Sequence, residues 1–303
     1  MNITLKQLRA FCAVYELQSF TQAAKILHLT QSAVSKLCAE LETEFGLPLF
    51  ERTTRRVEPC DGASLLYAHA TEVLGSLRSA ERSLSNLVEL ESGAISVAAS
   101  PMMMVGLIGN MLADFHREYP NVKLNLLELP SDQTVEAVLN GHADMGLVSA
   151  EIREKKLSAR AIYLDQMYLA CPTDHELAAK KRVQWADLAK YPHIVLHEVY
   201  NVRRTVDRFL AEHKLTPPAA IQTGLLTSAL FLVKQGLGVT VVPGYVCEFV
   251  AQMGLAAKKL HGPADYSHPI SLVLRKPVRH SIAAQAFQER LLAYLQQRQS
   301  RVA

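Results

Sequence analysis

Apolar residues recur at helical spacing through the first 45 residues of the chain. The first run consists of Leu5, Leu8, Phe11, Cys12 and Tyr15. Steps of three and four positions predict an amphipathic helix with one buried face. Ser19 or Thr21 can cap a second helix and Thr30 a third, which Gly46 and Pro48 end. The pattern therefore predicts three short helices, the last two separated by a tight turn.

The second and third predicted helices have the spacing of a helix-turn-helix unit. Such a unit needs a small residue where its helices cross and an aliphatic residue on the second helix. Ala24 and Val34 stand at these positions when Phe20 is counted as the first. The turn position that glycine commonly occupies is His28. The spacing alone leaves both DNA binding and an ordinary helical core open.

The polar face of the third predicted helix carries side chains that can contact DNA. Its first two turns present Gln31, Ser32, Ser35 and Lys36. The start of a recognition helix meets base edges, where Gln and Ser exchange hydrogen bonds and Lys reaches a phosphate or guanine. The next segment, "LFERTTRRVEP", contains Arg52, Arg55 and Arg56. It is either a solvated turn or a wing that grips phosphates or enters the minor groove.

Residues 64–90 predict one long helix with a single apolar stripe. The stripe consists of Leu66, Ala70, Val73, Leu77, Ala80, Leu84 and Leu87. Alternating steps of four and three give a repeat of about 3.5 residues, which is typical of a coiled-coil seam. Arg78, Glu81, Arg82 and Glu89 leave the other side polar. The stripe must therefore be covered, either by a partner helix or by the chain's own domain.

Beyond residue 93, predicted strands alternate with predicted helices. Strands are expected at 94–100, 122–129, 143–149, 162–172, 193–198, 219–224, 239–243 and 269–276. Helices are expected at 102–120, 132–141, 205–213, 227–238 and 281–298. This alternation implies parallel pairing in open α/β sheets. Two such units imply a cleft between them, with the ligand beyond the carboxyl ends of the strands.

Three predicted helix starts in this region are candidate anion sites. Ser100 would cap a helix that has Pro101 at its first position, Ser131 precedes Asp132, and Thr227 precedes "SALFLV". Unpaired N–H groups and the helix dipole both favour an anion at such a start. Simple capping explains Ser or Thr at any single helix start equally well.

Composition narrows the class of protein without identifying it. The 303 residues carry a net charge of only +3, with 20% charged and 49% hydrophobic residues, which is a globular composition. Five widely spaced cysteines without a CxxC pair indicate a reducing compartment, although Cys171 and Cys247 could meet through the fold. The uncharged stretch 92–113 is long enough to span a bilayer, but its Ser, Pro, Gly and Asn residues favour a buried strand and helix. No signal peptide is recognised, and a cytoplasmic, soluble protein is expected.

Enzymatic signatures are missing from the sequence. It contains no G-x-S-x-G elbow, no P-loop and no H-E-x-x-H motif. "GLGVTV" has two glycines of a dinucleotide fingerprint but not the third, and His193 and His197 lie in a predicted strand, where a four-residue spacing does not pair metal ligands. No catalytic residue, metal site or cofactor is expected. The alternative is a small-molecule-binding α/β protein or enzyme that does not bind DNA.

The chain resembles LysR-type transcriptional regulators. The shared elements of the first 60 residues are Leu-x-x-Leu-x-x-Phe, Ser-Phe-Thr-x-Ala-Ala, Thr-Gln-x-Ala-Val-Ser, Leu-Glu-x-x-x-Gly and Leu-Phe-x-Arg. The later segments "FHREYPNVKLNL", "LNGHADMGLV", "HELAAKKRVQWADL" and "VKQGLGVTVVP" extend the resemblance more loosely over the rest. One departure is "PCDGA" at 59–63, where Cys60 replaces the usual capping Thr, so that Asp61 is expected to start the next helix.

The residue patterns and the resemblance together give two sets of functional residues. The resemblance itself implies DNA contacts for Gln31, Ser32, Ser35, Lys36 and Arg52, and effector contacts for Ser100, Ser131, Asn201 and Val202. The DNA-binding set is Thr30, Gln31, Ser32, Ser35, Lys36, Arg52, Arg55 and Arg56. The effector-binding set is Ser100, Met102, Met103, Ser131, Asn201, Val202 and Thr227. Methionines beside Ser100 indicate an adaptable apolar wall, so the expected effector is a small organic anion with an apolar body.

The resemblance also implies an α/β architecture in three parts. Residues 1–60 are expected to form a winged helix-turn-helix and 61–91 a linker helix through which the protein dimerises. Residues 92–303 are expected to form a two-lobed effector domain similar to periplasmic solute-binding proteins, with lobe I at 92–163 plus 267–303 and lobe II at 164–266. The implied partners are double-stranded DNA with a dyad-related operator, a small-molecule effector and RNA polymerase. A tetramer is implied by the family alone, since the heptad pattern supports only a dimer.

Overall fold

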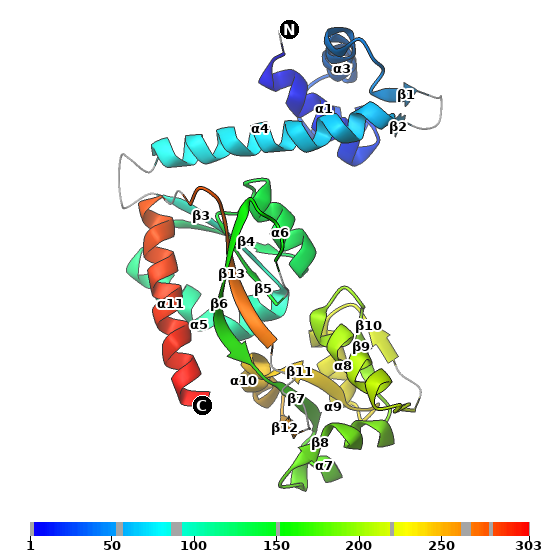
Figure 1. The fold of residues 1–303 in the computed structure, drawn as a ribbon, viewed down its shortest axis with the longest axis vertical. Helices are drawn as coiled ribbons and strands as arrows, with labels where there is room; N and C mark the ends of the chain where they lie inside the picture. Colours follow the sequence, from blue (N-terminus) through cyan, green and yellow to red (C-terminus); the bar gives the residue numbers. More distant parts are fainter. Residues whose placement is uncertain are drawn as a thin grey trace. The chain divides into compact units, whose positions relative to one another are not determined.

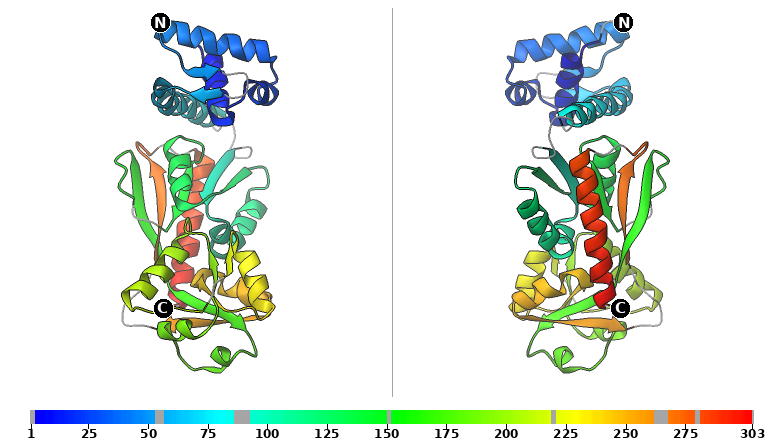
Figure 2. Two further views of the ribbon diagram at one scale, coloured as in Figure 1. Left: turned by 90° about the vertical axis from the view of Figure 1, so that its right-hand side faces the viewer. Right: turned by 90° about the vertical axis from the view of Figure 1, so that its left-hand side faces the viewer.

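The computed structural model describes residues 3–52, 57–85, 93–149, 152–218, 221–261, 268–278 and 281–302. The chain forms two compact units, 1–84 and 85–303. Figure 1 shows the helices and strands of both units in sequence colours, and Figure 2 shows them from two further sides.

The first unit begins with three helices whose ends are set by the predicted capping residues. These are α1 (Leu5–Leu17), α2 (Phe20–Ile26) and α3 (Gln31–Phe45). Ser19 accepts a hydrogen bond from the Gln22 amide, and Thr30 accepts one from the Ala33 amide. Gly46 ends α3 in the left-handed conformation, with φ of 69°. The caps satisfy amide groups that each helix cannot pair internally, and this explains why the helices start at these residues.

The turn between α2 and α3 keeps its geometry although glycine is absent. His28 has φ of 54°, in the left-handed region where a glycine is unstrained. The Leu29 amide donates to the Ala24 carbonyl at 2.9 Å, which closes the turn. Behind the turn, Ala24, Val34 and Phe11 are buried in one core. Packing of α1 against α2 and α3 therefore imposes a conformation that His28 alone would not choose.

A two-stranded hairpin completes the winged helix-turn-helix. Strands β1 (Phe50–Arg52) and β2 (Val57–Pro59) pair antiparallel, with Phe50 opposite Pro59. The Glu42 carboxylate accepts the amides of Leu49 at 2.9 Å and Phe50 at 3.2 Å, and so joins the start of the hairpin to α3. The winged helix-turn-helix expected from the sequence is thus confirmed.

Helix α4 (Asp61–Ser85) follows the hairpin and begins at the expected Asp61. Ala70 and Leu74 on α4 are buried in the core of the first unit. Tyr67 stacks on Tyr15 with ring centroids 4.2 Å apart and donates a hydrogen bond to Glu16 at 2.8 Å. The first half of the predicted seam therefore partly covers its own domain. The side chains from Arg78 to Ser85 and the whole of Leu87 lie outside the described residues.

The second unit contains a five-stranded sheet within the described chain, in the order β4-β3-β5-β13-β6. Its strands are β3 (Ala94–Ala99), β4 (Lys123–Glu128), β5 (Met145–Val148), β6 (Leu157–Asp165) and β13 (His268–Arg275). Strand β3 pairs parallel with β4 and β5, whereas β13 pairs antiparallel with β5 and β6. Ile95 and Val97 of β3 belong to the core shared with α5 (Gly109–Glu118) and α11 (Ile282–Val302). Ala98 belongs to the core on the other face, under α6 (Ser131–Leu139).

The same unit contains a four-stranded sheet, in the order β11-β7-β12-β8, and a parallel pair of β9 and β10. The strands are β7 (Met167–Pro172), β8 (Val183–Gln184), β9 (Ile194–Leu196), β10 (Ile221–Thr223), β11 (Thr240–Pro243) and β12 (Leu255–His261). The α-helices of this part are α7 (Glu176–Ala179), α8 (Asn201–Glu212), α9 (Leu226–Lys234) and α10 (Cys247–Gln252). Phe209 of α8 packs with Leu169 of β7 in one core, and Leu230 of α9 packs with Ala170 of β7 in the other. Helices therefore cover both faces of β7.

Three details of the sequence-based expectation are wrong. The parallel pairing expected for the sheets does not hold for β13, which runs antiparallel to β5 and β6, or for β7, which runs antiparallel to β11 and β12. The strand expected at 162–172 is two strands, because β6 ends at Asp165 and β7 begins at Met167 in the other sheet. The helix expected at 102–120 is interrupted by a π-turn at 103–107, after which α5 begins at Gly109. Gly106 explains the close approach there, since a Cβ on it would lie 2.6 Å from Val246 Cγ1. The strand break and the π-turn both lie where the five-stranded and four-stranded sheets meet.

Candidate functional site

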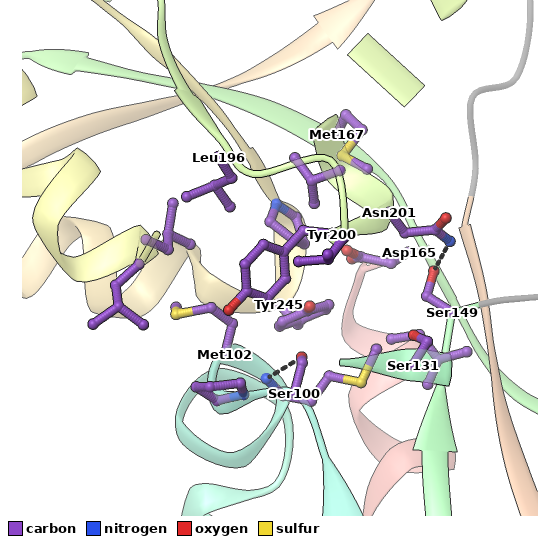
Figure 3. Close-up of a pocket in the computed structure, with 18 of the residues that line it drawn as sticks. Ser100, Met102, Ser131, Ser149, Asp165, Met167, Leu196, Tyr200, Asn201 and Tyr245 are labelled. Atoms are coloured by element: carbon purple, nitrogen blue, oxygen red, sulfur yellow. Dashed lines mark hydrogen bonds between the residues drawn. The ribbon is translucent and has the colours of Figure 1, made fainter. Parts of the chain in front are cut away.

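A cavity opens between the five-stranded and four-stranded sheets of the second unit (Figure 3). All seven residues of the predicted effector set line it, namely Ser100, Met102, Met103, Ser131, Asn201, Val202 and Thr227. The space open to the centres of water molecules is about 80 Å³.

Most of the cavity wall is apolar. Met102 and Met103, at the start of the π-turn, line the cavity together with Met167, Leu196 and Leu226 from the other half. Unbranched methionine side chains adapt their shape to a ligand, as expected for the wall beside Ser100. Among the described lining residues there is no lysine, arginine, histidine or cysteine.

Three helices of the described chain begin at the cavity without a side-chain cap. Helix α6 begins at Ser131, α8 at Asn201 and α9 at Leu226. The residue before each of these helices makes no capping hydrogen bond from its side chain. Their first amide groups are therefore available to a ligand, and each helix start carries a partial positive charge of about 0.5.

The three Ser and Thr positions predicted at helix starts play different local roles. Ser100 caps its segment as expected, because its hydroxyl accepts the Met103 amide at 3.3 Å. Ser131 is the first residue of α6 rather than the residue before it. Thr227 lies inside the first turn of α9, because the helix starts one residue earlier than expected. Neither Ser131 nor Thr227 caps its helix, and capping accounts for Ser100 only.

A hydrogen bond connects the two halves of the cavity wall. The Asn201 amide donates to the Ser149 hydroxyl at 3.1 Å, which links the start of α8 to the end of β5 (Figure 3). The Arg204 guanidinium donates to the Asn201 side-chain oxygen at 3.1 Å. Because its oxygen is held by Arg204, the Asn201 amide presents its NH₂ group toward Ser149 and the cavity.

Asp165 is a buried carboxyl group in the cavity wall, with only 4% of its surface exposed. Burial raises its pKa to about 7, and backbone amides of Gln166 and Gly244 partly oppose that rise. The Gly244 amide donates to Oδ2 at 2.9 Å. Gly244 is required there, since a Cβ on it would lie 2.9 Å from Asp165 Oδ1. A carboxyl group with this pKa is partly ionised at neutral pH.

Arg298 of α11 holds the two halves together beside the cavity. Its guanidinium donates to the carbonyls of Gly106 at 2.6 Å and Leu107 at 3.0 Å, and to that of Tyr245 at 2.8 Å. Tyr245 lines the cavity, and burial raises the pKa of its hydroxyl while a hydrogen bond from Ser100 opposes the rise. The π-turn and the segment after β11 are thus fixed by one side chain from the C-terminal helix.

The predicted DNA-binding residues lie on one face of the first unit where the structure describes them. Thr30, Gln31, Ser32 and Lys36 are exposed, and Ser35 is half-buried. Val34, Cys38 and Leu41 occupy the buried face of the same helix. Arg52 ends β1, but its side chain is outside the described residues, as are the whole of Arg55 and Arg56.

Sequence reasoning missed several cavity residues, of which Asp165 and Tyr245 are the most informative. Asp165 carried a signal, because it is the one charged residue in the apolar run "IYLDQMYLAC". Tyr245 carried none, since it follows a strand end as many surface residues do. Ser149, directly after β5, and Tyr200, directly before α8, were also missed.

The described residues offer little to redox or metal chemistry. Burial raises the pKa of the Cys171 thiol to about 11 and that of Cys247 to about 12, which keeps both protonated and weakly nucleophilic. No group of three His, Cys, Asp or Glu side chains in the described chain is arranged to hold a metal ion. None of the helices searched among the described residues is long and apolar enough to cross a membrane.

Two family models match the chain and together cover nearly all of it. The bacterial regulatory helix-turn-helix of the lysR family matches residues 5–63, and the LysR substrate binding domain matches residues 89–296. A relative from Shigella flexneri, the uncharacterized HTH-type transcriptional regulator YfeR, is 29% identical over 94% of this chain and 92% of its own length. The RuBisCO operon transcriptional regulator of Allochromatium vinosum is 28% identical over 97% of each chain.

Solved structures share the fold over the whole chain. The LysR family transcriptional regulator CbnR superposes with a TM-score of 0.70 at 21% identity, covering 96% of this chain and 99% of its own. CbnR in complex with its target DNA gives 0.68 at 21% identity, with the same coverage. A variant of full-length OxyR from Pseudomonas aeruginosa gives 0.69 at 20% identity, covering 98% and 95%. With both domain models matched in order along one chain, the protein belongs to the LysR family of bacterial transcriptional regulators.

Proposed function

We propose that this regulator is switched by a small organic anion with an apolar body that binds in the cavity between the two sheets. The ligand would contact the residues predicted from the sequence, Ser100, Met102, Met103, Ser131, Asn201, Val202 and Thr227. The effector domain would act as two lobes, 92–163 plus 267–303 and 164–266, which close on the ligand. A ligand changes the equilibrium between two states only if it binds them with different affinity, and closure of a two-sided cavity provides that difference.

The observation that carries the proposal is the convergence of three uncapped helix starts on one apolar cavity. The starts of α6, α8 and α9 each contribute amide donors and a partial positive charge of about 0.5. The amide groups and positive dipole ends of these three helices can bind a carboxylate without a lysine or arginine in the wall. The methionine and leucine side chains would contact the apolar body of the same ligand.

We further propose that residues 1–60 bind a dyad-related operator through Thr30, Gln31, Ser32, Ser35 and Lys36, with Arg52, Arg55 and Arg56 in the wing. Exposure of the polar face of α3 supports this assignment, as does the DNA complex of the similar regulator CbnR. A dimer formed through residues 61–91 would present two recognition helices to one site, and two dimers would form a tetramer. Such a regulator would act in the cytoplasm, with RNA polymerase as a further partner.

We assign the cavity to binding rather than to catalysis. Asp165 is the one carboxyl group among the described lining residues, and no histidine, lysine or cysteine stands beside it in the wall. Nucleophilic and acid–base mechanisms need such a pair within hydrogen-bonding reach. A solute-binding protein that never touches DNA would lack the exposed polar face of α3.

A thermal-shift screen of the full chain against small carboxylic acids tests the proposal. A ligand at a hundred times its dissociation constant adds about 2.7 kcal/mol to the free energy of unfolding, which is easily seen. The double variant Ser100→Ala, Ser131→Ala should lose at least tenfold in affinity for a hit. Thr173→Ala, an exposed threonine outside the cavity wall, is the matched control and should bind as the wild type does. Equal affinity in the double variant would show that the cavity is not the effector site.

A further inference from the structure

The cavity wall contains a second polar group, the carboxyl group of Asp165, which binding of an anion at the helix starts does not explain. Asp165 lies in the same wall as the three helix starts, yet it is an acid rather than a base. An apolar acid placed beside it would leave a buried carboxyl group facing hydrocarbon and a like charge nearby, and both are unfavourable. A ligand complementary to the whole wall must therefore carry a hydrogen-bond donor for Asp165 as well as an acceptor for the amides at the helix starts.

The hydrogen-bonding capacity of Asp165 is not exhausted by the protein. A carboxylate has about four positions at which it can accept a hydrogen bond. In the described chain its donors are three backbone amides, those of Gln166, Gly244 and Tyr245. Arg298 is close enough to affect its charge, but the guanidinium donates to backbone carbonyls instead. At least one acceptor position of this buried group therefore remains for a donor in the cavity.

The neutral side chains around Asp165 do not fill that position either. The Asn201 amide donates to Ser149, and the Ser100 hydroxyl accepts the Met103 amide. Tyr245 forms its side-chain hydrogen bond with Ser100. Among the described residues the donors to Asp165 are backbone amides, and no side chain of the wall donates a hydrogen bond to it.

We propose that the effector is a small organic acid that also carries a hydrogen-bond donor, a hydroxyl or an ammonium group, which binds Asp165. This inference rests on the proposed function and specifies its ligand further. The carboxylate of the ligand occupies the amide donors at the helix starts, its short apolar part contacts the methionines, and its donor group contacts Asp165.

A matched series of four-carbon acids tests the donor requirement in the full-length protein. Butyrate lacks a donor, 2-hydroxybutyrate and 4-hydroxybutyrate carry a hydroxyl, and 2-aminobutyrate and 4-aminobutyrate carry an ammonium group. Isothermal titration at millimolar concentrations gives the dissociation constant of each. We expect at least one donor-bearing acid to bind ten times more tightly than butyrate, because a site that hydrogen-bonds a ligand group rejects the analogue lacking it. The two pairs distinguish hydroxyl from ammonium.

The variant Asp165→Asn identifies the acceptor. The amide keeps the shape of the side chain and removes its charge, so the advantage of the preferred donor-bearing acid over butyrate should fall at least tenfold. Thr173→Ala, which changes an exposed hydroxyl outside the cavity wall, should leave that advantage in place. An advantage that survives Asp165→Asn unchanged overturns the proposal. If Asp165→Asn does not fold, the comparison of the five acids in the wild type decides by itself whether the ligand needs a donor group.

Two results separate this inference from the function on which it rests. If butyrate binds as tightly as every donor-bearing acid, and Ser131→Ala weakens it, the cavity is an anion site and the donor requirement is wrong. If none of the five acids binds at 50 mM, the ligand class proposed here is wrong. The wider screen of carboxylic acids against the double serine variant then tests the cavity independently.

Discussion

Lys36 has the environment of a residue that meets a phosphate. Its side chain is 79% exposed, and its ammonium group lies 4.0 Å from the Glu40 carboxylate, a surface pair that contributes little to folding. Each phosphate neutralised by a lysine releases counterions, which changes the slope of log affinity against log salt by about 0.9. Because the proposed dimer carries two copies of Lys36, we expect Lys36→Ala to flatten that slope by about 1.8 on duplex DNA of arbitrary sequence, as measured by fluorescence anisotropy.

Lys123→Ala provides the matched control for this measurement. Lys123 is an exposed lysine at the start of β4, in the effector domain, so its removal changes net charge equally without touching the helix-turn-helix. The slope of log affinity against log salt for Lys123→Ala should equal that of the wild type. The assignment of α3 to DNA would be wrong if both variants flattened the slope equally, because the effect would then reflect net charge rather than position.

Single residues also show where sequence reasoning succeeds and where it stops. Ser19, Thr30 and Gly46 could be assigned from the sequence, because caps act on amides within a few residues of themselves. Asp165 could not be assigned to the cavity, since the amide it binds belongs to Gly244, 79 positions away. Local chemistry is readable from a short window of sequence, whereas a site assembled by the fold is not.

At the scale of elements, α4 has two apolar sides, one packed against the first unit and one exposed in the single chain. Ala70 and Leu74 are buried against the first unit, whereas Val73 is 49% exposed. Val73 belongs to the predicted seam, which a second copy of the helix would cover in a dimer. In a two-fold dimer, Val73→Glu brings two carboxylates to the seam. We expect it to raise the dimer dissociation constant at least tenfold, measured by sedimentation velocity.

Ala68→Glu separates a seam effect from a general effect on α4. Ala68 is exposed and lies on the opposite side of the helix from Val73, five residues away at about 100° per residue. This control should dimerise as the wild type does. A dimer that tolerates Val73→Glu equally well would place the subunit interface elsewhere.

The elements themselves were predicted unevenly. Strands and helices with a clear period were recovered in order, including β3, α6, β11 and α11. The period failed at Asp165, because the end of β6 and the start of β7 form one continuous apolar run and only the structure shows that the two strands belong to different sheets. For the coiled-coil stripe the period left the packing partner open: Leu66 and Ala70 fit the heptad and pack against the core of their own unit. A repeat identifies an apolar face but not the partner that covers it.

At the scale of the whole molecule, Asp165 links folding stability to pH. Its pKa is 3.8 in the unfolded chain and about 7 in the folded protein. Between these values the folded state retains a proton that the unfolded state has lost, so stability falls as pH rises from about 4 through 7. The gap corresponds to about 4 kcal/mol at most, since one pKa unit is about 1.4 kcal/mol. Asp165→Asn removes this dependence, so the variant should gain stability over the wild type between pH 5 and 8.

Urea unfolding of both proteins at pH 5, 6, 7 and 8 measures the difference directly. His193 acts in the opposite direction, because burial lowers its pKa below the ordinary value of 6.5, so that protonation at falling pH favours the unfolded chain. That contribution is common to both proteins and cancels in the comparison. The difference should grow steadily toward pH 7 and level off above it, where Asp165 is ionised in both states. If the two stability profiles run parallel, Asp165 is already ionised in the folded protein at pH 5. Its carboxylate would then be stabilised by stronger hydrogen bonds than three backbone amides provide.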